Sequence, residues 1–247
     1  MTYIACSINK NGIVIGSDTR ANYFDDYIEK GEIKGKQIKF YWDGNKKLFL
    51  LKNKIAVAIQ GLLFWGDQKI LLSKHIDNIE KILSDEKIEI VARKIHKYFK
   101  ETKRKNSEQY EVEHFLVCGI ENSTPKGFYV NIYYNEDRGI QELPFNEDKT
   151  LYVNGDGKAE YIDKVASIEK NISFCKEEVL KKHLEIPYDV GDKVDILTIP
   201  SNKPPYWAEQ TEEIISYNSY DDLMQAIKCQ KLKVEMLNNP QVLFYKQ

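Results

Sequence analysis

The sequence predicts an α+β protein in which two antiparallel sheets are covered by helices. Two pairs of strand-like segments come first, and two helical stretches, further strands, further helices and a last strand follow. Hairpins build antiparallel sheets, and helices can cover their apolar faces. With 247 residues, 42% hydrophobic and 30% charged, the chain can bury one sizeable core and has a length common among single domains.

The first pair of strands lies at the start of the chain. Residues 3–8 and 13–16 read as strands, and Asn11-Gly12 stands between them. Asn-Gly between two such runs is the strongest short-range hairpin signal. Cys6 alternates with Ile4 and Ile8, so we expect it to be buried on one face of the first strand. The second strand ends at Asp18, which the hairpin folds back beside residue 2.

A second hairpin precedes the first helices. Residues 46–51 and 55–59 read as strands joined by the turn 52–54, and the second strand stops at Gln60-Gly61. Apolar residues with helical spacing then predict helices over about 62–83 and 88–103, the second with an N-cap region at Ser84-Asp85. The segment between the two hairpins, residues 22–45, is expected to be a long loop.

The remaining chain is expected to alternate between strands and helices. Strands are predicted at 114–120, 127–133, 139–143, 151–153 and 194–199, and helices near 158–169 and 175–183. We assign residues 1–200 to one domain and residues 201–247 to a helical extension, packed on that domain or on a neighbouring subunit. In the extension, Pro204-Pro205-Tyr206-Trp207 is typical of a rigid linker, and residues 221–237 predict an amphipathic helix.

Composition excludes several classes of function. The net charge is −2 and acids are interleaved with lysines, which argues against nucleic acid as a partner. No apolar run is long enough to span a bilayer and no secretion signal is present, so we expect a cytoplasmic protein without a membrane partner. The four cysteines are widely separated and the histidines lack metal-ligand spacing. We therefore expect no metal and no cofactor.

Thr2 is the candidate nucleophile. It follows Met1, and cells usually remove a first methionine when the next residue is small. A free N-terminal threonine carries a nucleophile and a base in one residue, because its α-amine has an unperturbed pKa near ~7.7–8.0. Taken alone, Thr2 reads better as an ordinary strand residue, and Asp18 as a residue that caps a strand or forms a surface pair with Arg20.

Order and spacing together favour a catalytic reading. Thr2, the strand GIVIGSDTRA, the hairpin KKLFLLKNKIAVAIQG and the helical stretch after its glycine resemble the proteasome β-subunit family of N-terminal-nucleophile (Ntn) hydrolases, which includes bacterial proteasome-related peptidases. The resemblance covers residues 2–100 well and the rest loosely. It implies a four-layer αββα sandwich of two antiparallel sheets flanked by helices.

The resemblance assigns roles to single residues. Thr2 matches the nucleophile and Asp18 the acid that ends the second strand. Lys47 matches the lysine beside the nucleophile, whose charge would keep the amine neutral. We prefer Lys47 to Lys34 because Lys47 has the strand context, although it requires an insertion at 22–45. Gly61 matches the glycine whose backbone N–H, at the start of a helix, faces the oxyanion.

The match weakens towards the C-terminus. Asp156, in Asn154-Gly155-Asp156-Gly157, stands where the family has a serine, and it could accept a bond from the amine or merely cap a helix. The later Asp-x-x-Ser-Gly element of the family is not recognisable, and Asp189 is its nearest candidate. Ile59 and Leu63 flank Gly61 where the family shapes its specificity pocket, which implies an apolar pocket.

The implied function is a threonine peptidase that cleaves peptide amide bonds. Its partners would be a peptide or unfolded-protein substrate, further copies of the chain in a homo-oligomeric ring and, as in some members of the family, an ATPase. A small-amide hydrolase is a close variant. The alternative is a non-catalytic subunit of the same fold that serves assembly or partner binding. Asp156 favours this alternative, whereas the set of Thr2, Asp18 and Lys47 opposes it.

Overall fold

The structure is a computed structural model with α+β architecture. It describes residues 3–30, 32–61, 63–65, 68–102, 112–133, 139–154, 159–187, 189–212, 217–229, 232, 234–237 and 242–244. All strand pairs within these ranges are antiparallel, as the sequence predicts.

Two large sheets form the body of the protein. The first has the order β13-β12-β1-β2-β14-β15, with β1 (Ile4–Asn9), β2 (Gly12–Asp18), β12 (Thr150–Val153), β13 (Ala159–Ile162), β14 (Val194–Pro200) and β15 (Tyr206–Glu209). The second has the order β11-β10-β9-β6-β5, with β5 (Leu48–Leu51), β6 (Ile55–Gln60), β9 (Val112–Glu121), β10 (Thr124–Tyr133) and β11 (Ile140–Glu142).

Smaller sheets and four helices complete the described part. A long hairpin of β3 (Ala21–Glu29) and β4 (Glu32–Trp42) pairs with the short strands β16 (Glu235–Met236) and β17 (Val242–Phe244). β7 (Phe64–Trp65) pairs with β8 (Ile70–Leu71). The helices are α1 (Leu72–Ile82), α2 (Ile88–Thr102), α3 (Ile168–Glu185) and α4 (Tyr220–Lys228). No helix of the described residues is long and apolar enough to cross a membrane.

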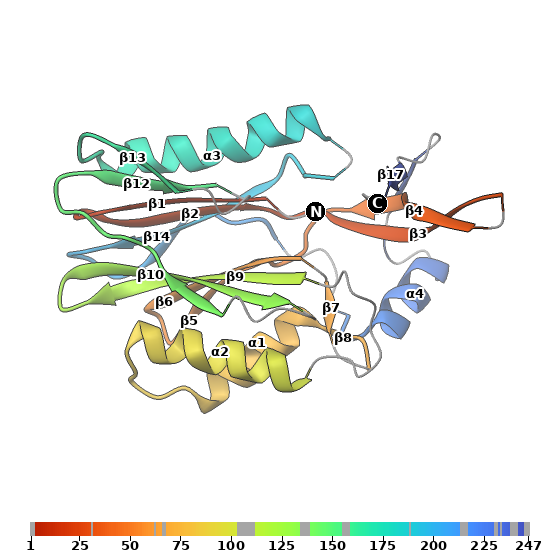
Figure 1. Ribbon diagram of the computed structural model, residues 1–247, viewed down its shortest axis with the longest axis horizontal. Coiled ribbons are helices and arrows are strands. Elements are labelled where there is room, and N and C mark those ends of the chain that lie inside the picture. Colours follow the sequence, from red (N-terminus) through yellow and green to blue (C-terminus); the bar gives the residue numbers. More distant parts are fainter. Residues whose placement is uncertain are drawn as a thin grey trace.

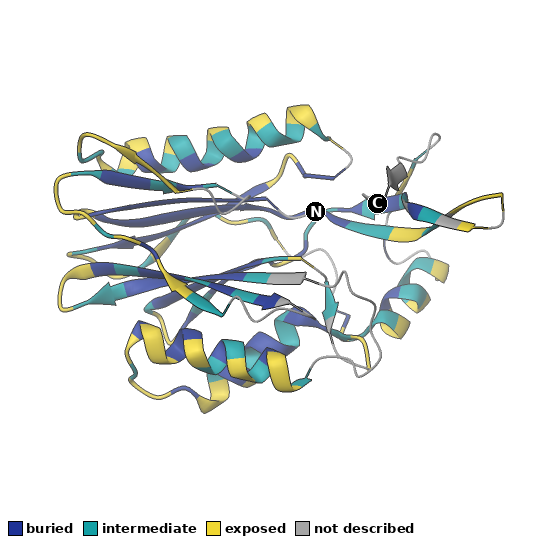
Figure 2. Ribbon diagram, viewed as in Figure 1, coloured by how far each residue is buried: buried dark blue, intermediate teal, exposed yellow. Residues whose placement is uncertain are grey.

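The core lies between and outside the two large sheets. In Figure 1 the sheets lie face to face, α3 covers the first sheet, and α1 and α2 cover the second. Side chains of both sheets meet in one apolar cluster, in which Cys6 and Ile8 of β1 pack with Leu116 and Cys118 of β9. Cys6 is fully buried, so that prediction is confirmed. The central strands β1, β2 and β14 of the first sheet are accordingly buried along their whole length, whereas its edge strand β13 is exposed (Figure 2).

Of the predicted helices, the one at 62–83 starts too early, and the one at 158–169 is wrong except for its last two residues. The stretch 62–83 becomes helical only at Leu72, because Phe64 and Trp65 pair with Ile70 and Leu71. In the stretch 158–169, residues 159–162 form edge strand β13, and α3 begins at Ile168 after its N-cap Ser167. In both places a strand partner that is distant or unrecognised overrides helical spacing.

The C-terminal region also differs from the prediction. Tyr206 and Trp207 belong to β15 and pair with Thr198 and Leu197, so this segment is an edge strand and not a linker. The helix predicted at 221–237 ends at Lys228, and Leu232 is buried beyond it. Leu232 belongs to the apolar cluster on the β3–β4 hairpin.

The expected loop at 22–45 is largely this hairpin. In Figure 1 it extends away from the two stacked sheets, and α4 lies beside it. Register shifts at Tyr23/Phe24 and Tyr27/Ile28 break the alternation along β3. A bulge moves the following side chains to the opposite face, which hides the period of two in the sequence.

The first hairpin turns one residue earlier than predicted. Asn9 pairs with Gly12, so Lys10 and Asn11 form the turn and Gly12 begins β2. Gly12 has φ of 141°, and a Cβ there would lie 2.4 Å from the Ile199 carbonyl oxygen. Glycine is therefore required where β2 passes the end of β14.

We expect Gly12→Ala to lower the free energy of unfolding by about 1–3 kcal/mol or more, because it combines a disfavoured φ with a backbone clash. Urea unfolding followed by circular dichroism measures the change. Lys10→Ala, in the exposed turn, is the matched control and should shift stability by no more than about 0.5 kcal/mol. Equal midpoints for the two variants would contradict this account of Gly12.

Candidate functional site

Asp18 is the last residue of β2, and two hydrogen bonds hold it to Tyr3, which directly precedes β1. Ile4 pairs with Ser17, and the next step of the ladder joins the Asp18 N–H to the Tyr3 carbonyl oxygen at 3.3 Å. In return, the Tyr3 N–H donates to Asp18 Oδ1 at 2.8 Å. Thr2 itself lies outside the described residues. The residue that follows it is thus bonded directly to the Asp18 carboxylate.

Lys47 forms a buried ion pair with Asp18. Its Nζ lies 2.9 Å from Asp18 Oδ2, and the two side chains are 8% and 0% exposed. The Ile59 N–H donates to the Lys47 carbonyl oxygen at 2.9 Å, which fixes Lys47 at the entry to β5. Lys47 itself lies just before β5, whereas Lys34 lies within β4, so the assumption that only Lys47 has strand context was wrong.

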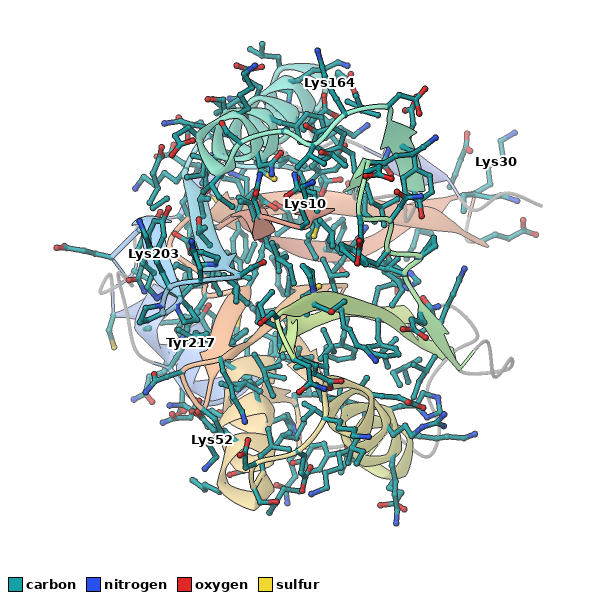
Figure 3. All side chains as sticks on the ribbon, turned by 90° about the vertical axis from the view of Figure 1, so that its left-hand side faces the viewer. Lys10, Lys30, Lys52, Lys164, Lys203 and Tyr217 are labelled. Carbon is teal, nitrogen blue, oxygen red and sulfur yellow. The ribbon has the colours of Figure 1, made fainter. Side chains whose placement is uncertain are left out.

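Lys34, the competing lysine, lies on the hairpin and pairs with Glu32. Lys46, next to Lys47, is exposed, with its Nζ 4.9 Å from the centre of the Phe49 ring. Lysines extend into solvent at many other places, including five labelled in Figure 3: Lys10, Lys30, Lys52, Lys164 and Lys203. A buried lysine is uncommon by comparison, and here it is paired.

The Asp18 carboxylate accepts from further backbone groups. Besides Tyr3 and Lys47, the N–H groups of Arg20 and Gly191 donate to Oδ2 at 3.0 and 3.3 Å. A buried charge is tolerated only with such partners, since desolvation otherwise costs several kcal/mol. These donors lie far apart in the sequence, between Tyr3 and Gly191, so the carboxylate holds distant segments of the chain together.

Arg20 is a site residue that the sequence analysis missed. Its Nε and Nη2 donate to the two carboxylate oxygens of Asp43, each at 2.8 Å, and its Nη1 donates to the Pro187 carbonyl oxygen. Its guanidinium carbon lies 4.0 Å from the centre of the Tyr41 ring. Burial opposes the charge, but Asp43 outweighs it and raises the pKa of Arg20. Only its place two residues after Asp18 could have suggested a role.

Asp189 lies near the site but binds a different group. It is buried, and the Asn22 side-chain amide donates to its Oδ1 at 2.6 Å. Gly191, two residues later, packs so closely that a Cβ there would lie 2.9 Å from Asp43 Oδ1 and 3.0 Å from Arg20 Cβ. The segment proposed for the family's later motif therefore does reach the site, where its Gly191 N–H contacts Asp18.

Gly61 lines a pocket together with Lys47. It follows β6 with φ of 143°, and the pocket, of about 100 Å³, is also bordered by Asn22, Ile59 and Leu63. The other lining residues are the apolar Ala21, Phe24 and Leu72 and the polar Arg20, Lys46 and Ser73, so the lining is mixed. The expectation that Gly61 begins a helix was wrong, because α1 starts only at Leu72. A helix dipole at Gly61 therefore contributes nothing to the site.

The structure thus gathers three of the five candidate residues. Lys47 joins Asp18 on one side and the pocket of Gly61 on the other. Thr2 and Asp156 lie outside the described residues. Within the described ranges, no group of three histidine, cysteine, aspartate or glutamate side chains could hold a metal ion.

A second, polar cavity of about 240 Å³ adjoins the site, and Lys46 lines both this cavity and the pocket of Gly61. Thr19, Lys46 and Asp195 line it, and Asp195 Oδ1 accepts from the Thr211 N–H at 2.6 Å. Burial raises the pKa of Asp195, and the nearby charge of Asp18 adds to the shift. Asp18 and Asp195 are therefore two buried carboxylates, of which only Asp18 has a lysine as an ion-pair partner in the described residues.

We expect Asp18→Asn to destabilise the fold by about 3–5 kcal/mol, because it leaves Lys47 buried without a counter-charge. It also turns an N–H group of the new amide towards backbone donors. Urea unfolding measures the loss. Asp85→Asn, which breaks an exposed pair with Lys54, is the control and should change stability by about 0.5 kcal/mol or less. Similar losses in both variants would show that the buried pair has no special weight.

The raised pKa of Asp195 predicts that the free energy of unfolding falls as pH rises and Asp195 ionises. As pH rises, an unfolded aspartate loses its proton near ~3.9, before the folded one does, so the free energy of unfolding falls. Asp195→Asn keeps an acceptor for Thr211 and removes this titration. We expect it to be more stable than the wild type at about pH 7 and equal to it near about pH 3.

Thermal unfolding at both pH values tests this expectation. Asp148→Asn, in an exposed turn, is the control and should follow the wild type throughout. A gain for Asp195→Asn that is the same at both pH values would assign it to packing and not to titration.

Comparison with known proteins gives no match. The sequence matches no protein-family model and no curated protein. What the chain does must therefore be argued from the Asp18–Lys47 pair, the pocket beside it and the chemistry that these groups allow.

Proposed function

We propose that the chain is a threonine-type peptidase of the proteasome-like Ntn class, with Thr2 as its nucleophile after removal of Met1. The observation that carries the proposal is the buried Asp18–Lys47 pair bonded to the backbone of Tyr3, the residue next to Thr2. Buried, closely paired charges beside a pocket are typical of functional sites. We also propose that α3, the two large sheets, and α1 with α2 are the layers of an αββα sandwich.

The proposed reaction begins at the threonine hydroxyl. Its oxygen attacks the carbonyl carbon of the substrate amide, and the Thr2 α-amine takes the hydroxyl proton. The tetrahedral intermediate then expels the amine, which leaves with the proton from the Thr2 ammonium. An ester remains between the Thr2 oxygen and the acyl group. Water, deprotonated by the same amine, cleaves this ester and restores the hydroxyl.

Lys47 and Asp18 would set the charge around this chemistry. The ammonium of Lys47 disfavours a second positive charge nearby, so it keeps the Thr2 amine neutral and able to act as a base. It also stabilises negative charge on the hydroxyl oxygen as the proton leaves. Asp18 holds Lys47 charged and in place. The Gly61 N–H is the proposed donor to the oxyanion, as a backbone group and without a helix dipole.

The pocket suggests the kind of substrate. Its lining by Ile59, Leu63 and Leu72 suits an apolar side chain of a peptide or unfolded protein. A ring of several copies would enclose such sites in a chamber, and an ATPase could deliver substrate to it. We include the ring and the ATPase in the proposal because of the resemblance to the family.

Intact mass of the tag-free protein, before and after incubation with a peptide epoxyketone, tests the proposal. This electrophile bonds to the hydroxyl and the amine of one N-terminal threonine. We expect loss of Met1 and a mass increase equal to one inhibitor molecule per chain, absent from Thr2→Ala. Thr19→Ser is the matched control, since Thr19 directly follows Asp18 but has no N-terminal amine, and this variant should still form the adduct.

Two results would count against a peptidase. Retained Met1 blocks the amine, and processed protein without an adduct lacks a working nucleophile. Either would favour the non-catalytic subunit, in which the Asp18–Lys47 pair only joins the first sheet to the second.

A further inference from the structure

The segment that begins at Tyr217 contacts two parts of the chain that border the pocket, the β3–β4 hairpin and the stretch between Gly61 and α1. Its backbone pairs with the chain before α1, since the Leu71 N–H donates to the Asn218 carbonyl oxygen at 2.8 Å and the Tyr220 N–H to that of Lys69 at 3.1 Å. Its apolar side chains Leu223 and Leu232 pack with Phe40 and Trp42 of the hairpin. The segment therefore links the hairpin to the region between Gly61 and α1 (Figure 1).

Tyr217 connects this segment to the loop that carries Lys47. Its hydroxyl donates to Asn45 Oδ1, and Trp42 Nε1 donates to both the Tyr217 hydroxyl, at 3.0 Å, and Asn45 Oδ1, at 3.2 Å. All three residues are buried within or beside the apolar cluster on the hairpin. Polar groups enclosed in this way hold a defined geometry, because each bond lost leaves an atom without a partner.

Asn45 passes this constraint on to the site. Its Nδ2 donates to the carbonyl oxygens of Thr19 and Trp42, at 3.2 and 3.3 Å, so its Oδ1 must be the atom that faces Tyr217. Its backbone N–H also donates to the Thr19 carbonyl oxygen, at 2.9 Å. Asn45 lies two residues before Lys47. Its bonds to Thr19, the residue after Asp18, therefore fix the start of the loop that carries Lys47.

We propose that Tyr217 is a positioning residue for the site: through Asn45 it holds the loop that delivers Lys47 to Asp18. The C-terminal segment is then a working part of the active site and not only a cover for the hairpin. This inference rests on the proposed peptidase function for its effect on rate, but the constraint on the loop can be measured without any activity.

Tyr217→Phe is the test variant, because it removes one oxygen atom and leaves Trp42 bonded to Asn45. We expect the rate of epoxyketone adduct formation, per folded molecule, to fall by about 10-fold, the size expected when positioning of a catalytic group is loosened. We also expect the acid limb of the pH–rate profile to move to higher pH. A less closely held Lys47 charge lowers the pKa of the Thr2 amine less, and a simple loss of folded protein would not move this limb.

Tyr220→Phe is the matched control. Its hydroxyl belongs to the same segment but contacts the Tyr23 hydroxyl, at 3.3 Å, and not the loop. It should keep the rate and the pH profile of the wild type. Asn45→Asp, which keeps the acceptor for Tyr217 and loses the donor to Thr19, should reproduce the effect of Tyr217→Phe from the other end of the network.

Amide hydrogen exchange separates this inference from the proposed function. In Tyr217→Phe the Asn45 amide should exchange at least about 10-fold faster, relative to amides within β6, than in the wild type or in Tyr220→Phe. Unchanged exchange, rate and pH profile would overturn the role of Tyr217 while the peptidase stands. A wild type that forms no adduct would overturn the peptidase, and the exchange of Asn45 would then still decide whether Tyr217 holds the loop.

Discussion

A buried carboxylate needs hydrogen-bond donors, and those of Asp18 come from segments that are far apart in the sequence. Tyr3 directly precedes the first strand, Lys47 lies at the entry to β5, and Gly191 lies in the loop after α3. The cost of desolvating the charge is offset only while all of them stay in place. The relative position of the two large sheets at this end is therefore tied to a single side chain.

The packing around the site follows from this constraint. Arg20 and Asp43 fill the space beside Gly191 so completely that the loop has no room for a side chain there. Tyr217, Trp42 and Asn45 hold the other side of the loop before Lys47. Polar networks thus surround the ion pair on two sides, whereas apolar clusters fill the space between the two sheets and under their helices.

The parts that could be predicted are those with local signals. Alternation and turns located the β1–β2 and β5–β6 hairpins. Strand context did not distinguish Lys47 from Lys34, since Lys34 lies within β4 and Lys47 just before β5. The β3–β4 hairpin was missed because its bulges break the alternation. Arg20 was missed because its partner Asp43 lies beyond that hairpin. The start of α1 was misplaced because β7 and β8 form a short hairpin, and Leu71 also bonds to Asn218, far along the chain.

The hairpin between Asp18 and Lys47 is closed at its base. Thr19 bonds to Asn45, Ala21 pairs with Trp42, and the strands beyond this point run outward from the body of the protein. A segment with fixed ends can grow or shrink at little cost in closure entropy, because that cost rises only with the logarithm of length. A change in the length of the outer hairpin therefore costs little in closure entropy while its pairing with β16 and β17 is kept, and the buried ion pair at its base stays in place.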